Sequence, residues 1–479
     1  MSPPDYLIKG GRVLIWDELK KSSFPQLDIL IQGQHITRIG PNLDVEINDS
    51  IEVVDATSHI VTPGFIDGHR HAFQSQLRST VSNHTLLEYC AHLLQGRMAF
   101  LEADDMYLSQ LSGCTEAINS GVTTIMDHSH AVTTPDRAQK CIKATLESGI
   151  RSIYCAAPFA IPTSLNPMTL PDMTVQHAAQ VDMIKQLVTE EPLGGPMNDG
   201  RVTLGLGFDT MYYLPTEMSR EILTFAKDHN LPTTMHDVPR YNLPASTYLR
   251  DNNMPLPKVT LSHTCDPDAR TIEWVKEHDI GVVSTPESEM AMSHGHPSGL
   301  EFHQANCRAG VGIDSPAICS GDLFFAMRLG LQEKRVRENA RFHERGKLAD
   351  VVPARTDEVL YMATLGGAEA IHLESQIGSL TEGKFADLVL IRTDSPGMVS
   401  AVDCSAALVT HAAASDVDSV MINGEWVKRE GRLLKVDWNS LKGTLQENRA
   451  GLEKRWEGVD WEMNKSDLKD LWHLRDVME

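Results

Sequence analysis

Two histidines separated by one residue, His69 and His71, directly follow a strand-like run at 60–65. Side chains alternate in direction along an extended strand, so both imidazoles point to the same face. Two imidazoles on one face can bind one metal ion. The same pair in a loop would be ordinary surface histidines, and the spacing alone does not separate the two interpretations.

Three further polar residues each close a later strand-like run. They are His236 after 232–235, His263 after 259–262 and Asp314 after 310–313. Burying a polar group is costly unless something pairs with it, so four histidines and one aspartate at one rim are hard to explain by packing. Imidazole and carboxylate are ligands for zinc, iron or manganese. We therefore predict a divalent metal site, with Zn²⁺ first and Fe²⁺ or Mn²⁺ as alternatives.

The same residues suggest how such a site would work. A divalent ion with an open coordination position lowers the pKa of bound water toward neutrality. A nearby carboxylate such as Asp314 can take the proton of that water and deliver it to a leaving group. An imidazole such as His263 can orient the water or polarise the substrate. Asp314 and His263 are therefore the predicted catalytic residues.

The elements that must position these side chains form a repeating pattern. Eight short apolar runs alternate with helix-like stretches, at 60–65, 123–126, 151–156, 202–207, 233–235, 259–261, 281–283 and 310–313. This alternation predicts a distorted (β/α)8 TIM-like barrel, in which catalytic residues gather at the carboxyl ends of the strands. A doubly wound sheet alternates in the same way, but we find no GxGxxG after the first strand and no P-loop.

The two ends of the chain have a different texture. Short strand-like runs with turn residues fill the first sixty residues and return at 386–391 and 417–431, so the two pieces could pair. We predict an α/β protein in three parts. A small β-sandwich is built from 1–62 and 375–437, the metal-dependent barrel spans 63–374, and amphipathic helices form a C-terminal extension at 438–479.

Composition excludes several classes of protein. Lys+Arg 43 against Asp+Glu 65 gives a net charge of 43 − 65 = −22, so we expect no nucleic-acid partner and no membrane surface. No apolar stretch approaches the ~18 residues that cross a bilayer, and we see no signal peptide.

The eight cysteines form no CxxC pair, which indicates reduced thiols. We expect a cytoplasmic homo-oligomer, a dimer or tetramer, that acts on a small molecule.

Several segments together resemble the amidohydrolase superfamily, and within it the branch of cytosine deaminases and chlorohydrolases. They are 63–71 (PGFIDGHRH), His236, His263, Asp314 and 378–391, with further matches at Gln74, 77–78, 121–124, Asp127 and 286–297. The resemblance implies four metal ligands, which are His69, His71, His236 and Asp314. It implies that His263 contacts the metal-bound water or the substrate. The fourth strand ends in 206–209 (LGFD) without a lysine, so a carbamylated lysine bridging two metals is absent and one ion is expected.

The chain departs from this pattern after the fifth strand. Deaminases of the branch carry a glutamate three residues after the strand-five histidine, where it passes a proton to the attacked ring nitrogen. Here that position is Pro239. Asp237 and Glu287 are the carboxylates that could replace it. The predicted substrate-binding residues are Gln74, His130, Asp237, His263 and Glu287.

The predicted function is hydrolysis of a carbon–nitrogen bond, other than a peptide bond, in a small molecule through metal-activated water. Two alternatives use the same metal. One is deamination of an aminated heterocycle with a substituted proton shuttle, and the other is a lyase or dehydratase reaction of specialised metabolism. A binding protein that inherited the barrel is disfavoured because every expected metal ligand is present.

Overall fold

A ring of parallel strands lies at the centre of the computed structural model, which describes residues 5–130, 133–190 and 199–472. Eight strands pair in chain order: β8 (Phe65–Arg70), β9 (Val122–Ser129), β10 (Arg151–Ala156), β11 (Val202–Gly207), β12 (Thr233–Asp237), β13 (Val259–His263), β14 (Gly281–Ser284) and β15 (Arg308–Val311). The ring closes between its first and last strands through a parallel bridge of Arg70 with Asp314. This arrangement confirms the predicted TIM-like barrel.

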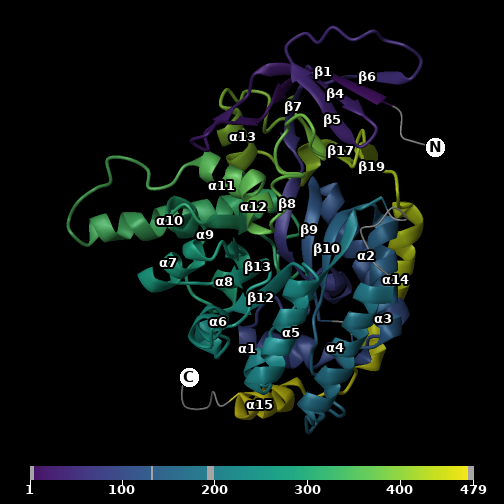
Figure 1. Cartoon of the computed structure of the whole chain (residues 1–479), viewed down its shortest axis with the longest axis vertical. Helices are drawn as coiled ribbons and strands as arrows, with labels where there is room; N and C mark the ends of the chain where they lie inside the picture. The colour runs from purple at the N-terminus through teal and green to yellow at the C-terminus, as the bar shows by residue number, and fades with distance from the viewer. Residues whose placement is uncertain (1–4, 131–132, 191–198, 473–479) are drawn as a thin grey trace.

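Helices cover the outside of the ring (Figure 1). They are α2 (Ala103–Asn119), α3 (Pro135–Ser148), α4 (Met173–Glu190), α5 (Thr216–Asp228), α6 (Ala245–Asp251), α7 (Ala269–Glu277), α8 (Pro286–Ala291), α9 (Gly299–Gln304), α10 (Leu323–His343), α11 (Thr356–Met362) and α12 (Leu365–Ala370). In α5 the buried positions are 219, 222, 223 and 226, the spacing of one helical face. Side-chain caps begin others, as where Asp268 accepts the N–H of Thr271 at the start of α7.

The predicted first barrel strand at 60–65 is wrong. Residues 59–63 form β7 (His59–Pro63), which pairs with strands of a second sheet. The barrel strand β8 begins only at Phe65. An uncharged and mainly apolar run at 60–66 contains the end of β7 and the start of β8, and periodicity alone does not locate the break inside it. As a result His69 lies within β8 instead of following the strand.

The second sheet joins both ends of the chain. Its order is β19-β18-β17-β16-β7-β1-β4-β5, with β6 also paired to β1. The strands are β1 (Asp5–Val13), β4 (Gln26–Gln32), β5 (His35–Gly40), β6 (Ile51–Asp55), β16 (Leu388–Arg392), β17 (Val417–Ile422), β18 (Glu425–Arg429) and β19 (Arg432–Leu433). Antiparallel pairing of β7 with β16 connects the N-terminal and C-terminal strands. The hairpin β17–β18 turns at Asn423 and Gly424, which both have positive φ, as a two-residue type I′ turn requires.

This sheet curls around its own core. Tyr6 in β1 and Trp426 in β18 lie four strands apart in the pairing order, yet their rings are 5.7 Å apart. Arg429 of β18 also forms an ion pair with Glu52 of β6. A flat sheet would hold these strands far apart, since neighbouring strands are separated by ~4.8 Å. The additional β-unit from both ends of the chain is therefore present.

Two helices follow the second sheet. α14 (Trp438–Arg455) packs Leu441 and Leu445 against residues of α2 and α3. α15 (Trp461–Leu471) lies at the end of the barrel far from the second sheet, near α1 (Leu86–Tyr89) (Figure 1). Lys465 of α15 binds Glu88 of α1 at 2.6 Å. Among the helices of the described ranges, none is long and apolar enough to span a bilayer.

A buried ion pair fastens the second sheet to the barrel. Arg151, at the start of β10, donates to both carboxylate oxygens of Asp387 at 2.7 and 3.1 Å and to Asn423 at 2.9 Å. Both charged side chains are almost fully buried. We expect Arg151→Met to lower the free energy of unfolding by ~3–5 kcal/mol, because it leaves the charge of Asp387 buried without a partner. Chemical denaturation measures this loss.

Lys143→Met is the matched control. Lys143 faces Glu147 at 3.8 Å, and both side chains are largely exposed, so its loss should change stability little. If Arg151→Met costs no more than this control, the ion pair does not fasten the two parts together.

Candidate metal centre

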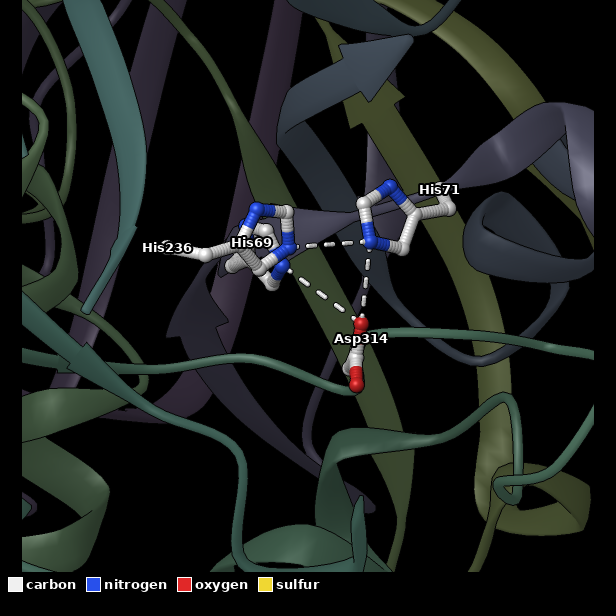
Figure 2. Close-up of side chains that lie close together, drawn as sticks. All are labelled: His69, His71, His236 and Asp314. Carbon is white, nitrogen blue, oxygen red and sulfur yellow. Dashed lines mark hydrogen bonds and ion pairs between the residues drawn. The ribbon is translucent and has the colours of Figure 1, made fainter. Parts of the chain in front are cut away.

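Four side chains meet at the carboxyl end of the barrel (Figure 2). His69 lies in β8, His71 follows it, His236 lies in β12, and Asp314 follows β15. Asp314 Oδ1 is 3.4 Å from His69 Nε2 and 3.1 Å from His71 Nε2. The Nε2 atoms of His71 and His236 are 3.3 Å apart. The four ligand atoms all lie within 4.8 Å of one another, so one ion can reach them all.

The spacing fits a metal ion. Ligands held ~2.0–2.1 Å from zinc in a tetrahedron lie roughly 3.3 Å from each other. The three separations of 3.1, 3.3 and 3.4 Å match this edge length. In addition, His69 Nε2 is buried and has no hydrogen-bond partner. A buried nitrogen without a partner is costly, and a cation would use its lone pair.

The Nδ1 atom of each histidine already has a partner, which orients Nε2 toward the centre. Nδ1 of His71 donates to the carbonyl of His128 at 2.6 Å. Nδ1 of His69 lies 2.8 Å from the hydroxyl of Ser262. Nδ1 of His236 lies 2.9 Å from Asp209. Hydrogen bonds of this kind fix ring direction and leave Nε2 free for a metal.

The residue between the two histidines, Arg70, shows why both imidazoles face inward. Arg70 points to the opposite side of β8, where it is fully buried and binds Asp67 at 3.1 Å and Glu116 at 2.8 Å. This alternation is what a strand imposes. The ion pairs hold Arg70 on its side, so His69 and His71 stay on the other.

Electrostatics favour a cation at this place. Burial raises the pKa of Asp314, but the neighbouring rings of His69 and His71 outweigh it and hold the pKa well below its usual value. Burial lowers the pKa of His69 well below its usual value, so this imidazole is neutral. Burial also lowers the pKa of His236, yet Asp209 and Asp314 outweigh it and raise the pKa. The two carboxylates therefore stabilise positive charge here, which a metal ion would supply.

His263 stands beside the centre. Its ring is buried, and its Nδ1 lies 2.9 Å from Thr285 Oγ1 and 3.5 Å from Glu289. Burial lowers the pKa of His263 to about 3, so the ring is neutral. His263 and Asp314 both have positive φ, 78° and 66°, a strained conformation for such residues that occurs preferentially at functional sites.

A cavity of about 260 Å³ opens onto these residues. Most of its wall is apolar: Leu86, Leu94, Phe159, Ala160, Leu170, Met173, Val238, Leu243, Met292, Leu471 and Trp472. Its polar wall includes His71, His130, Asp209, His236, His263, His294 and Asp314. Of the predicted substrate-binding residues, His130 and His263 thus line the cavity. Leu471 and Trp472 come from the C-terminal extension, so this part of the chain contributes to the cavity.

Three predicted substrate-binding residues do not line the cavity. Gln74 is buried behind it and bonds to Tyr89 and Ser315. Asp237 follows His236 in β12, so its side chain points to the other face, where it accepts the N–H of Ser246 at 3.2 Å. Glu287 lies on α8 and accepts the N–H of Ser320 at 2.8 Å.

Two polar cavity residues, Asp209 and His294, are not among the predicted substrate-binding residues. Asp209 comes shortly after the end of β11, just as Asp314 comes shortly after the end of β15. A polar residue at the end of a predicted strand was therefore a signal that could have identified Asp209. His294 lies in the loop after α8, and its ring centroid is 4.7 Å from that of His263. Both ring nitrogens of His294 are buried without a hydrogen-bond partner. His294 belongs to the 286–297 segment that matches the family pattern, but its place in the cavity depends on the path of the loop.

Comparison with known proteins agrees with the fold and the cluster. The profile of the amidohydrolase family matches residues 60–427. A 5-methylthioadenosine/S-adenosylhomocysteine deaminase of Carboxydothermus hydrogenoformans is 25% identical over 458 residues, covering 93% of this chain and 98% of that protein. A 5'-deoxyadenosine deaminase of Methanobrevibacter smithii is 23% identical, covering 85% and 90%.

Solved structures share the whole architecture. An adenosine deaminase from Xanthomonas campestris with bound zinc has a TM-score of 0.77 at 18% identity and covers 95% of this chain and 99% of that one. A mutant of atrazine chlorohydrolase from Arthrobacter aurescens, complexed with zinc and atraton, has a TM-score of 0.79 at 20% identity and covers 93% and 100%.

A TIM-like barrel with this cluster at its carboxyl end defines a metal-dependent hydrolase. The chain belongs to the amidohydrolase family, whose profile spans most of its length. The predicted family and the predicted class of enzyme, a hydrolase of carbon–nitrogen bonds other than peptide bonds, are both confirmed.

Glu289 behind His263 should make stability depend on pH. Burial raises the pKa of Glu289 from its ordinary 4.5 to about 8. The pKa of Glu289 is higher in the folded state than in the unfolded state, so between pH 4.5 and pH 8 unfolding releases a proton. The free energy of unfolding therefore falls as pH rises through this range. We expect Glu289→Gln, measured by chemical denaturation, to gain stability relative to wild type between pH 5 and pH 8. A difference that is the same at both pH values contradicts this.

Proposed function

We propose that the protein hydrolyses a carbon–nitrogen bond of a small, uncharged molecule, with His69, His71, His236 and Asp314 holding one divalent ion. The convergence of three imidazole nitrogens and one carboxylate oxygen carries the proposal. Zinc is the proposed ion, since zinc accompanies both solved structures named above. A bound divalent ion would supply a water of lowered pKa.

The chain's own residues would then handle protons and orientation. Asp314 is ionised, so its carboxylate can take a proton from the attacking water and return it to the leaving nitrogen. His263 has its Nδ1 engaged by Thr285, which leaves Nε2 to hold the water or the substrate in the cavity. The positive φ of both residues supports this assignment, because strained backbone is retained where position matters.

The cavity wall supports a restricted class of substrate. Within the described ranges no lysine or arginine lines the cavity, so neither of these side chains would balance the charge of a phosphate or a carboxylate on the part of the substrate that lies away from the metal. The wall is mainly aliphatic and aromatic, and Phe159 and Trp472 offer faces on which a flat ring could lie. We propose an uncharged substrate with an apolar or aromatic body and a carbon–nitrogen bond directed at the metal.

Deamination of a heterocycle is the second candidate, favoured by the deaminase names of the relatives. Pro239 stands where deaminases of this branch carry glutamate, and it is exposed on a short helix beyond β12. Asp237 and Glu287 do not line the cavity, so neither supports a replacement role. His294 does line it and has both ring nitrogens unpaired. We propose His294 as the group that would contact the ring nitrogen in such a reaction.

We also propose a cytoplasmic homo-oligomer, a dimer or tetramer. All eight cysteines are unpaired and seven of them are buried, which supports a reducing compartment. α10 and the segment after it project from the barrel (Figure 1). This projection exposes Val336, Leu348 and Val351. Large apolar side chains exposed on one projecting part of the chain favour contact with another subunit. The acidic balance of −22 supports a small molecule, not a nucleic acid, as partner.

Asp314 is the residue on which the mechanism depends most. We expect Asp314→Asn to fold and to keep most of its metal, because three imidazoles and an amide oxygen remain. Turnover should fall by about 10²–10⁴-fold, since the amide cannot accept the proton. Steady-state assay together with elemental analysis measures both. Unchanged turnover would remove the assigned role.

The nature of the reaction can be tested on products. We expect hydrolysis of a set of uncharged aminopurines, aminopyrimidines and aminotriazines to release ammonia and to add one water to the product mass. Loss of water without ammonia would instead indicate a lyase or dehydratase. His69→Ala with His71→Ala is the matched negative control, because removal of two ligands should abolish turnover together with the ion held at this centre.

A further inference from the structure

A second group of metal-ligating side chains lies beside the first, on the next strands of the ring. His128 lies in β9, His130 follows it, and Asp209 follows β11. Asp209 Oδ2 is 2.9 Å from His128 Nε2 and 3.2 Å from His130 Nε2. These atoms, with one ring nitrogen of His236, lie within 4.8 Å of one another. His128 and His130 repeat the one-residue spacing of His69 and His71.

Hydrogen bonding alone does not explain this group. Three ring nitrogens surround a single carboxylate oxygen, because His236 Nδ1 also lies 2.9 Å from Asp209 Oδ2. His130 and His236 bond to that oxygen, which takes up its two lone pairs. His128 is fully buried, and neither of its ring nitrogens makes a hydrogen bond. Its Nε2 is nevertheless aimed at the carboxylate from 2.9 Å.

The separations are those of ligands around an ion. Bonds of ~2.0–2.1 Å to zinc place neighbouring ligands roughly 2.9–3.4 Å apart for angles between 90° and 110°. Both contacts of Asp209 Oδ2, at 2.9 and 3.2 Å, fall in this range. The buried Nε2 of His128 would then have a partner, which removes the cost of leaving it unpaired.

The chain leaves room for this arrangement and access to it. Gly207 ends β11 next to His128, and a Cβ at that position would lie 2.9 Å from His128 Nε2, so a side chain there would crowd the ring. His130 and Asp209 both line the cavity. An ion could therefore enter from the cavity and keep open positions toward it.

We propose that His128, His130 and Asp209 form a second divalent-cation site, separate from the ion assigned to His69, His71, His236 and Asp314. The ligand atoms are the two Nε2 atoms and Asp209 Oδ2. Imidazole with carboxylate suits zinc, iron or manganese. Asp209 also receives a hydrogen bond from His236 Nδ1, so one carboxylate connects the two sites. His236 keeps its Nδ1 proton and is not shared between the ions.

Metal content of the full-length protein tests this inference. The protein is loaded with zinc, freed of excess by gel filtration and measured by elemental analysis. We expect two zinc ions per chain in wild type, and one in His128→Gln and in His130→Gln. The matched control is His294→Gln, which changes a buried cavity histidine outside both groups and should keep two. The double change His69→Ala with His71→Ala should lose the other ion and keep one.

The outcomes separate this inference from the proposed function. A single ion that the His69 and His71 changes remove, and that His128→Gln leaves in place, overturns the second site while the proposed function stands. A single ion with the reverse behaviour supports the second site and overturns the proposed metal centre. Zinc anomalous diffraction from wild-type crystals needs no variant, and a peak between His128 and Asp209 is expected. A peak at Asp314 alone overturns the inference.

Discussion

The closure of the barrel at Asp314 is the constraint on which the site depends. The N–H of Asp314 donates to the carbonyl of His69, and the N–H of His71 donates to the carbonyl of Asp314, each at 2.9 Å. One residue thereby closes the ring of strands and places its carboxylate between two imidazoles. Its left-handed φ costs energy, and the two backbone hydrogen bonds hold it in place. The backbone hydrogen bonds that close the ring of strands therefore also fix the position of the Asp314 carboxylate relative to His69 and His71.

Charge balance is the second constraint. Two carboxylates, Asp209 and Asp314, face a group of buried and mostly neutral imidazoles. Such an arrangement carries negative charge in a medium of low dielectric constant, where it is costly unless a cation offsets it. The apolar cavity wall strengthens this effect because it keeps the dielectric constant low. One or two bound divalent ions would restore the balance and at the same time supply the chemistry.

Predictions from the sequence succeeded where a local rule applies. The alternation of strands with helices predicted the barrel, and β10 and β11 begin and end where the apolar runs do. Period-two alternation placed His69 and His71 on one face. The same rule, applied to His236 and Asp237, shows that Asp237 must point away from a cavity that His236 faces. The prediction of Asp237 as a substrate contact was therefore already in conflict with the strand pattern.

The sequence by itself determined the ligand chemistry, because residue type and strand periodicity are local properties that a linear chain displays. It could not decide which polar residues share the cavity. His294 reaches it from a loop, Trp472 reaches it from the C-terminal helix, and Gln74 is held away from it by Tyr89. The positions of these three side chains follow from the paths of loops and from the packing of segments that are distant in the sequence. Only the tertiary structure determines these paths and this packing.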